Sequence, residues 1–479
     1  MNYSIIRYIL GTVLKFESLF LLLPVFVGFC YGERSAWAFF AVAMGCFAVG
    51  ILCSLRKPKS YIFYAVEGFV SVSLSWIVLS IFGALPFWIS REIPSFTDAL
   101  FETISGFTTT GASILSNVEA LSHACLFWRS FTHWIGGMGV LVFVLAVFPM
   151  RGGQTMFLMK AESPGPSVEK LVPRVRTTAT ILYAVYTVLT IVEIILLFVT
   201  GMPLFDSVTL SLGTAGTGGF GILNDSVAGY ASHLQVIITV FMILFGVNFN
   251  AYYLLLRKKP KEAVKSEEVR TYFGIILISS LVIAWNIRKL FPSAGEALKH
   301  AFFQVASIIT TTGYSTTDYD KWPQLSVSIL VALMFIGACA GSTGGGIKVS
   351  RILIMVKSVF KEIFLINHPH GVRMVKVDGR PIDRETRRSI HIFMVCYTMI
   401  FAASMLIISL DNFDFTTNFT AIVATINNIG PGLARVGPTA NFGIFSDLSK
   451  YVLMFDMLAG RLELLPMMVL FAPMTWRNR

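Results

Sequence analysis

Apolar runs of about twenty residues recur along this sequence, and they limit its fold more than any other feature. Each run can cross the ~30 Å hydrocarbon core of a bilayer as a helix that rises about 1.5 Å per residue. Hydrophobic residues make up 55% of the 479 positions and charged residues only 14%, so a soluble domain would lack polar surface. We therefore predict an all-α membrane protein with ten spans, at residues 9–30, 36–53, 62–89, 125–149, 178–201, 233–256, 272–290, 325–359 with an interruption, 390–410 and 451–473.

Basic residues alternate with the predicted spans. They gather in the loops at residues 56–59, 151–176, 257–270 and 348–388, whereas the intervening loops are rich in aspartate. The positive-inside rule places the basic loops and both termini in the cytoplasm and the acidic loops outside. An acidic outer surface concentrates cations. The net charge of +11 therefore indicates a membrane topology and not binding of nucleic acid.

The outer loops contain four similar segments, each of which ends in a turn of small residues. If Gly111, Gly219, Gly313 and Gly430 are aligned, the residues fifteen, eleven and seven positions before each glycine are all apolar. This stripe predicts a short helix of about ten residues before each turn. The four segments are SFTDALFETISGFTTTGAS (95–113), PLFDSVTLSLGTAGTGGFG (203–221), EALKHAFFQVASIITTTGYS (296–315) and DFTTNFTAIVATINNIGPG (414–432).

Each short helix lies between two full spans but is too short to cross the membrane itself. The chain would therefore enter as a half-helix and return as an extended strand. Backbone that is not helical is stable at this depth only when it is buried in protein or lines an aqueous path. The four turns, which recur about every hundred residues, are therefore predicted to surround one pore. Packing of small residues between helices is the alternative, and four matching turns favour the pore.

The turns supply the groups that a dehydrated potassium ion needs. Backbone carbonyls can replace the water of the ion, and glycine lets a carbonyl turn inward without a side-chain clash. The half-helices direct their partly negative C-terminal ends toward the cation. Threonines at 108–110 and 310–312 add hydroxyl groups. The candidate ion-binding residues are Thr109, Thr110, Gly111, Thr217, Gly218, Gly219, Thr311, Thr312, Gly313, Asn428, Ile429 and Gly430.

The turn sequences TTTGAS, GTGGFG, TTTGYS and NNIGPG resemble the four filter segments of the Trk/Ktr/HKT cation transporters. Over the whole chain the sequence looks most similar to the bacterial TrkH/TrkG branch of that family. The resemblance implies potassium uptake across the bacterial cytoplasmic membrane by a lipid-embedded homodimer. It also implies a cytoplasmic regulatory ring of the TrkA type that binds NAD, ATP or ADP. Potassium would be the transported ion, with no organic cofactor and no nucleotide-binding domain in this chain.

The resemblance further implies four tandem span–pore helix–span repeats after two extra N-terminal helices. The N-terminal helices would occupy residues 1–60, and the repeats residues 61–150, 151–258, 259–366 and 367–479. Each turn has one key glycine, whereas a potassium-channel filter alternates glycines, so discrimination against sodium is expected to be weaker. The fourth turn, Asn427-Asn428-Ile429-Gly430-Pro431, is the least regular and leaves sodium permeation open.

A glycine-rich stretch interrupts the second span of the third repeat. Residues 337–346 contain too much glycine for a stable helix. Ile347 separates Gly346 from Lys348 and no strand precedes them, so the stretch is not a phosphate-binding loop. By resemblance, residues 337–348 form an intramembrane loop that obstructs the ion path until the partner moves it; a close helix contact is the alternative. The candidate gate residues are Gly341, Gly344, Gly345, Gly346, Lys348 and Arg461.

Arg461 is interpreted as the only basic residue deep within a span, and intramembrane charge indicates function. By resemblance, it projects into the pore below the filter and raises the barrier to cations. An ion pair with Asp456 or with a neighbouring helix is the alternative. Glu67 and Glu193 also lie in or near spans, where a buried hydrogen-bonded carboxyl is favoured over a proton or sodium relay.

Two other classes of membrane protein fit the sequence less well. A secondary transporter for an organic substrate would show one central pocket instead of four matching turns. An embedded enzyme would need a nucleophile, a metal site or an acid/base pair in one cavity. The six cysteines lie singly in apolar stretches, and we predict no enzymatic activity. Passive conduction and coupling to sodium or protons both stay open.

Overall fold

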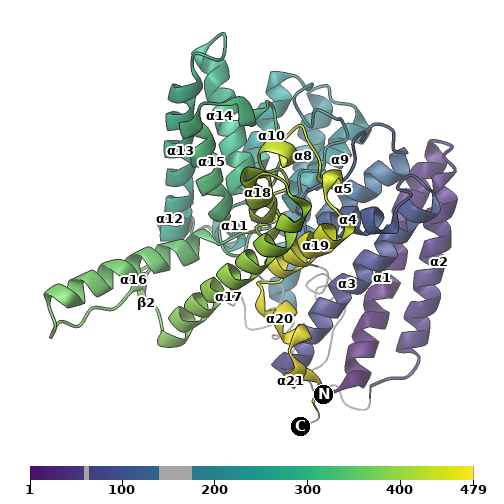
Figure 1. Cartoon of the computed structure of the whole chain (residues 1–479), viewed down its shortest axis with the longest axis horizontal. Coiled ribbons are helices and arrows are strands. Elements are labelled where there is room, and N and C mark those ends of the chain that lie inside the picture. Colours follow the sequence, from purple (N-terminus) through teal and green to yellow (C-terminus); the bar gives the residue numbers. More distant parts are fainter. Residues whose placement is uncertain (59–63, 140–174, 478–479) are drawn as a thin grey trace.

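The computed structural model describes residues 1–58, 64–139 and 175–477, where nearly all regular structure is helical (Figure 1). Six described helices are long and apolar enough to cross a membrane: α1 (Tyr3–Cys30), α2 (Ser35–Ser54), α3 (Ala65–Ile89), α8 (Val175–Val199), α13 (Glu267–Ile287) and α17 (Arg384–Ile408). The predicted span at 125–149 begins with α5 (His123–Met138). The rest of that span and most of the basic loop at 151–176 lie outside the described residues.

Three predicted spans are broken helices. The predicted interruption between α15 (Gln324–Phe335) and α16 (Val349–Asn367) is confirmed. The continuous spans predicted at 233–256 and 451–473 are wrong. One is α10 (Ser232–Phe245) followed at 89° by α11 (Phe249–Leu256), and the other is α19 (Asp447–Arg461) followed by α20 (Leu465–Phe471). Positive φ angles at Glu463 (61°) and Leu464 (63°) end α19.

Four short helices lie between the longer ones, as the apolar stripes predicted. They are α4 (Phe96–Phe107), α9 (Leu204–Gly216), α14 (Ala294–Ile309) and α18 (Phe415–Ile426). Ser95, Ser293 and Asp414 cap α4, α14 and α18, because each side-chain oxygen accepts the backbone N–H three residues later. The C-terminal half of all four helices is buried, so their last turns lie in the protein interior.

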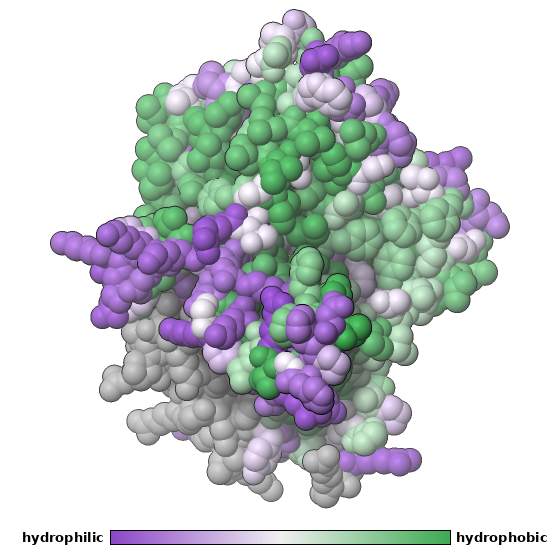
Figure 2. All heavy atoms as spheres, turned by 90° about the vertical axis from the view of Figure 1, so that its left-hand side faces the viewer, coloured by the Kyte–Doolittle hydropathy of each residue, from purple (hydrophilic) through white to green (hydrophobic). Residues whose placement is uncertain are grey.

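The outer surface is apolar where a bilayer would surround it. Leu277, Ile278 and Trp285 of α13 are among the exposed large side chains. Figure 2 shows hydrophobic residues over much of one face, with hydrophilic residues at its upper edge and on projecting segments. In Figure 1, α16 and the start of α17 extend away from the body, joined through the hairpin of β1 (Lys376–Val377) and β2 (Arg380–Pro381). The short helices α12 (Pro260–Lys265) and α21 (Pro473–Trp476) complete the described elements of four or more residues.

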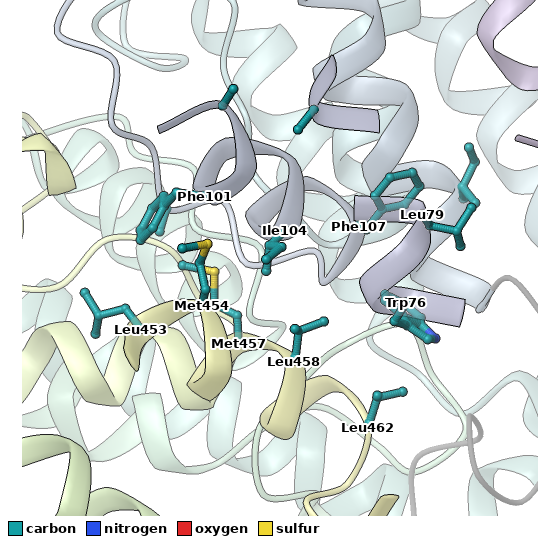
Figure 3. Close-up of a cluster of buried hydrophobic side chains, with 14 of the residues drawn as sticks. Trp76, Leu79, Phe101, Ile104, Phe107, Leu453, Met454, Met457, Leu458 and Leu462 are labelled. Atoms are coloured by element: carbon teal, nitrogen blue, oxygen red, sulfur yellow. The ribbon is translucent and has the colours of Figure 1, made fainter. Parts of the chain in front are cut away.

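The first short helix, α4, packs between α3 and α19. Phe101 of α4 faces Met454 of α19, and Phe107 points toward Leu79 and Trp76 of α3 (Figure 3). Lipid tails are as apolar as these side chains, so association here depends on close van der Waals contact more than on exclusion of water. Small changes in shape should therefore matter more than changes in hydrophobicity.

The spans α1 and α2 approach each other closely at two glycines. Gly11 and Gly50 let the two backbones touch, because a Cβ added to Gly50 would lie 2.9 Å from the carbonyl oxygen of Gly11. Gly45 lies on the same helix, and a Cβ there would meet nothing within 4 Å. The two glycines of α2 therefore test packing and helix propensity separately.

We predict that Gly50→Ala lowers the melting temperature of the protein in detergent, because overpacking costs about 1–3 kcal/mol. Gly45→Ala should leave the melting temperature unchanged or raise it, since alanine favours the helix by about 1 kcal/mol relative to glycine. Size-exclusion chromatography after heating measures both. Equal melting temperatures for the two variants would contradict the packing argument.

Candidate functional site

The four short helices end in the same way. In each, a residue with left-handed backbone follows the helix, and the next backbone N–H bonds to the carbonyl five residues before it. For α4 these are Thr109 (φ 54°) and the bond from Thr110 to Ser105 at 2.8 Å. The matching left-handed residues are Thr217, Thr311 and Asn428, with φ of 53°, 58° and 54°. This pattern is a Schellman cap, which glycine usually provides, and a residue other than glycine costs roughly 1–2 kcal/mol there.

Two residues after each cap, the key glycine also has a positive φ, which is 78° at Gly111, 75° at Gly219, 88° at Gly313 and 100° at Gly430. In each loop, two of three consecutive residues therefore have a positive φ angle. The sequence predicted one special position per loop. The second position is occupied by threonine or asparagine, so no glycine indicated it.

The key glycines close the four loops into a ring. A Cβ added to Gly111 would overlap the carbonyl oxygen of Gly218 in the second loop. The same overlap occurs between Gly219 and the Thr312 carbonyl, and between Gly313 and the Ile429 carbonyl. For Gly430, the Cβ would lie 2.8 Å from the carbonyl oxygen of Thr110, in the first loop. Each contact joins a glycine to the residue before the key glycine of the next loop, and the fourth contact returns to the start.

The fourth loop, which is the least regular in sequence, is bound to the ring by a side chain. Nδ2 of Asn428 donates to Oγ1 of Thr110 and to the carbonyl of Met457, both at 2.9 Å. In the first loop, the hydroxyls of Thr108 and Thr110 bond to each other at 2.8 Å, and the third loop repeats this bond. These hydroxyls therefore brace the loops against one another and against their helices.

A buried ion pair supports the first two loops from behind. Arg129 of α5 contacts Glu102 of α4 at 2.8 Å, and both side chains are buried. Glu102 also accepts the N–H of Ile114 at 3.1 Å, while Arg129 donates to the carbonyl of Gly221 at 3.1 Å. The prediction that Arg461 is the only basic residue deep in a span is therefore wrong. The arginine in the apolar run at 125–149 was the signal that could have identified this pair.

A cavity opens on the side of the ring where the chain continues after the turns. All four key glycines line it, together with polar residues from the segments after the turns, such as Ser113, Asn224, Ser315 and Asn441. A hydrated cation entering from this side would meet backbone and side-chain oxygens that can replace its water.

The glycine-rich loop lies directly against the other side of the third and fourth turns. The N–H of Gly345 donates to Oγ1 of Thr311 at 2.7 Å, and a Cβ on Gly345 would lie 2.5 Å from the carbonyl oxygen of Asn427. The ends of the loop are joined by the bond from Gly337 to Ile347 at 2.7 Å. No residue larger than glycine fits at positions 337 and 345.

The break between α10 and α11 holds this loop. The N–H of Cys339 donates to the carbonyl of Gly246 at 3.1 Å, and the N–H of Phe249 donates to the carbonyl of Gly341 at 3.0 Å. A straight helix would keep these groups in its own hydrogen bonds. The loop therefore supplies partners that make the 89° bend stable, which is why the prediction of a continuous span failed.

The basic side chains of Arg461 and Lys348 donate hydrogen bonds to carbonyls of the glycine-rich loop. Arg461 donates to the carbonyl of Thr343 at 2.9 Å and to the carbonyls of Gly136 and Gly137 at 2.5 and 2.6 Å. The ammonium of Lys348 donates to the carbonyls of Gly344 and Gly345. The structure therefore brings the predicted gate residues together. Asp456, considered as a partner of Arg461, accepts a hydrogen bond from Ser404 at 2.8 Å.

Glu67 and Glu193, the two other carboxyls considered in the sequence analysis, lie in different surroundings. Glu67 accepts the backbone N–H of Tyr64 at 3.0 Å and so caps the start of α3. Glu193 is fully buried on α8. Glu67 is therefore a hydrogen-bonded carboxyl with a structural role, as the sequence favoured.

Comparison with known proteins addresses the family and the overall fold of this chain. The family model TrkH, described as "Cation transport protein", matches residues 35–478. The chain is 36% identical to the Trk system potassium uptake protein TrkH of Salmonella typhimurium over the full length of both proteins. This chain belongs to the TrkH family. Its structure also matches the crystal structure of the potassium transporter TrkH from Vibrio parahaemolyticus, with a TM-score of 0.88, 32% identity and full coverage of both chains.

Membership of the TrkH family confirms the predicted resemblance and the all-α membrane fold. A TrkH relative from Halomonas elongata is 32% identical, again over the full length of both proteins. The full coverage means that the loops, the glycine-rich segment and the C-terminal helices all lie within the shared region.

We predict that Gly219→Ala abolishes ion flux through this TrkH-family protein, because its Cβ would overlap the Thr312 carbonyl and spread the ring. Gly201→Ala is the matched control, since Gly201 also has a positive φ (102°) but has nothing within 4 Å. Tracer flux into liposomes measures both. Equal flux in the two variants would mean that ring closure is unimportant.

Proposed function

We propose that this chain takes up potassium across the bacterial cytoplasmic membrane and that the ring of four loops is its selectivity filter. The observation that carries the proposal is the circular set of glycine-to-carbonyl contacts, which needs four loops around one axis. The names of the full-length relatives, which are potassium uptake proteins, support the identity of the ion.

Potassium is the cargo, and oxygens of the ring would replace its water. The residues proposed to contact it are the candidate set given above, from Thr109 to Gly111, Thr217 to Gly219, Thr311 to Gly313 and Asn428 to Gly430. The buried C-terminal ends of the four short helices add partly negative charge behind the loops. The proposal contains no enzymatic step and no organic cofactor.

The glycine-rich loop and the cationic side chains bound to it are proposed as the gate. The loop contacts Thr311 and Asn427, so it lies where an ion leaving the filter must pass. The positive charge of Arg461 would repel a cation at this point. The loop would have to move for conduction to occur.

A homodimer with a cytoplasmic nucleotide-binding ring of the TrkA type is proposed as the working assembly. The exposed, basic segment formed by α16, the hairpin and the start of α17 supports this, since it extends away from the helical body (Figure 1). The basic loops support cytoplasmic termini, and the repeats are proposed to follow the boundaries given above.

Rubidium uptake into liposomes that contain the purified protein tests the proposed function. Potassium should compete strongly and sodium weakly, because the carbonyl ring is expected to favour the larger ion. Equal competition by potassium, sodium and lithium would contradict a selective filter. Uptake that requires a sodium or proton gradient would favour the alternative, a K⁺/Na⁺ or K⁺/H⁺ symporter.

We predict that Arg461→Ala increases rubidium flux at least about tenfold, since a barrier lower by about 1.4 kcal/mol raises a rate tenfold. The substitution removes both the charge and the three bonds to carbonyls of the gate and of α5. Arg461→Lys keeps the charge and should change the flux less. Unchanged or slower flux in well-folded Arg461→Ala would exclude the barrier role.

A further inference from the structure

One carboxylate binds both the glycine-rich loop and the first turn of α16. Oε1 of Glu268 accepts the backbone N–H of Ala340 at 2.7 Å and that of Ser350 at 3.1 Å. Glu268 lies in the first turn of α13 and is 6% exposed. The two amides flank the part of the loop that packs under the ring. A single oxygen therefore links Ala340 of the loop to Ser350 of α16.

The chemistry of Glu268 suits this arrangement. An ionised carboxylate accepts an N–H bond about twice as strongly as a neutral oxygen does. Ala340 lies in the loop and Ser350 in the first turn of α16, where amides lack partners within the helix. Gly345 binds Thr311 at the opposite side of the loop. The loop is thus held by α13 at its base and by the filter at its tip.

The same end of α13 is bonded to the cytoplasmic hairpin. The N–H of Glu267 donates to Oδ1 of Asp378 at 2.6 Å. This bond caps the start of α13, because the side chain of the N-cap residue Ser266 makes no capping bond. The Glu267 carboxylate pairs with Lys357 of α16, and Lys357 also donates to the carbonyl of Lys376 at 2.8 Å. Adjacent residues of α13 therefore bind the hairpin and the gate loop.

We propose that Glu268 is a positioning residue that latches the gate loop beneath the filter, and that movement of the cytoplasmic hairpin releases it through the first turn of α13. The inference rests on the proposed function, because it assigns the regulation of the same loop. If Glu268 had only a structural role, its substitution would lower the melting temperature without making the gate loop open more often. The latch instead requires a folded protein whose gate loop opens more often.

The native Cys339 reports on the loop, since it is fully buried within it. In the full-length protein with the other five cysteines replaced by alanine, a small methanethiosulfonate reagent should modify Cys339 slowly. Glu268→Ala should increase this rate at least about tenfold, which corresponds to about 1.4 kcal/mol. Glu262→Gln, at an exposed carboxylate in α12, is the control and should leave the rate unchanged.

Two further variants make the test decisive. Glu268→Gln keeps an oxygen acceptor but loses the charge, and should increase the rate by a smaller factor of about three. It decides the outcome if the alanine variant does not fold. Asp378→Ala should also increase the rate, because it loosens the hairpin end of α13. An unchanged rate in folded Glu268 variants would overturn the latch, and an unchanged rate in Asp378→Ala would overturn the link to the hairpin.

Rubidium flux separates this inference from the proposed function. If both hold, Glu268→Ala conducts faster than the wild type, with the same preference for potassium over sodium. If Cys339 becomes reactive in Glu268→Ala but neither the wild type nor this variant transports rubidium, the latch stands and the proposed function fails. If the wild type conducts and the variant matches it in flux and in Cys339 reactivity, the function stands and the latch is wrong.

Discussion

The contact between each key glycine and the carbonyl of the next loop is the constraint on which the rest of this structure depends. It allows four segments roughly a hundred residues apart to meet with no side chain between them. Three features next to the ring support this contact. The Schellman caps aim the loops, the hydroxyl pairs brace them, and the buried pair of Glu102 and Arg129 holds the first two loops together.

A second constraint is the absence of water from the bilayer interior, which requires a partner for each exposed backbone group. The glycine-rich loop meets this requirement by bonding to another irregular segment. Its amides and carbonyls pair with those released at the break between α10 and α11, and each break makes the other stable. Each break in a helix would leave backbone groups without hydrogen bonds if it stood alone. The two breaks lie side by side, so these groups bond to one another.

The proposed filter and the proposed gate share a hydrogen bond to one hydroxyl. Thr311 occupies the left-handed cap position of the third turn, and its Oγ1 accepts the N–H of Gly345 from the loop beneath. Withdrawal of the loop would free that oxygen at the inner end of the filter. Gating and ion occupancy are therefore expected to influence each other, because both involve the same atom.

The sequence by itself determined the membrane location, the four short helices, the key glycines and the broken span at 325–359, because periodicity, hydropathy and glycine content are local properties of the chain. It indicated the proposed gate residues only through resemblance. Tertiary structure decided the left-handed threonines, the bend at 246–248, the pairing of Arg129 with Glu102 and the position of Glu268. Each of these depends on backbone or charged groups that find partners far away in the chain. Such partners meet only once the four loops have closed into the ring. A local pattern, such as Arg129 in an apolar run, can therefore indicate a group that needs a partner but cannot identify the partner.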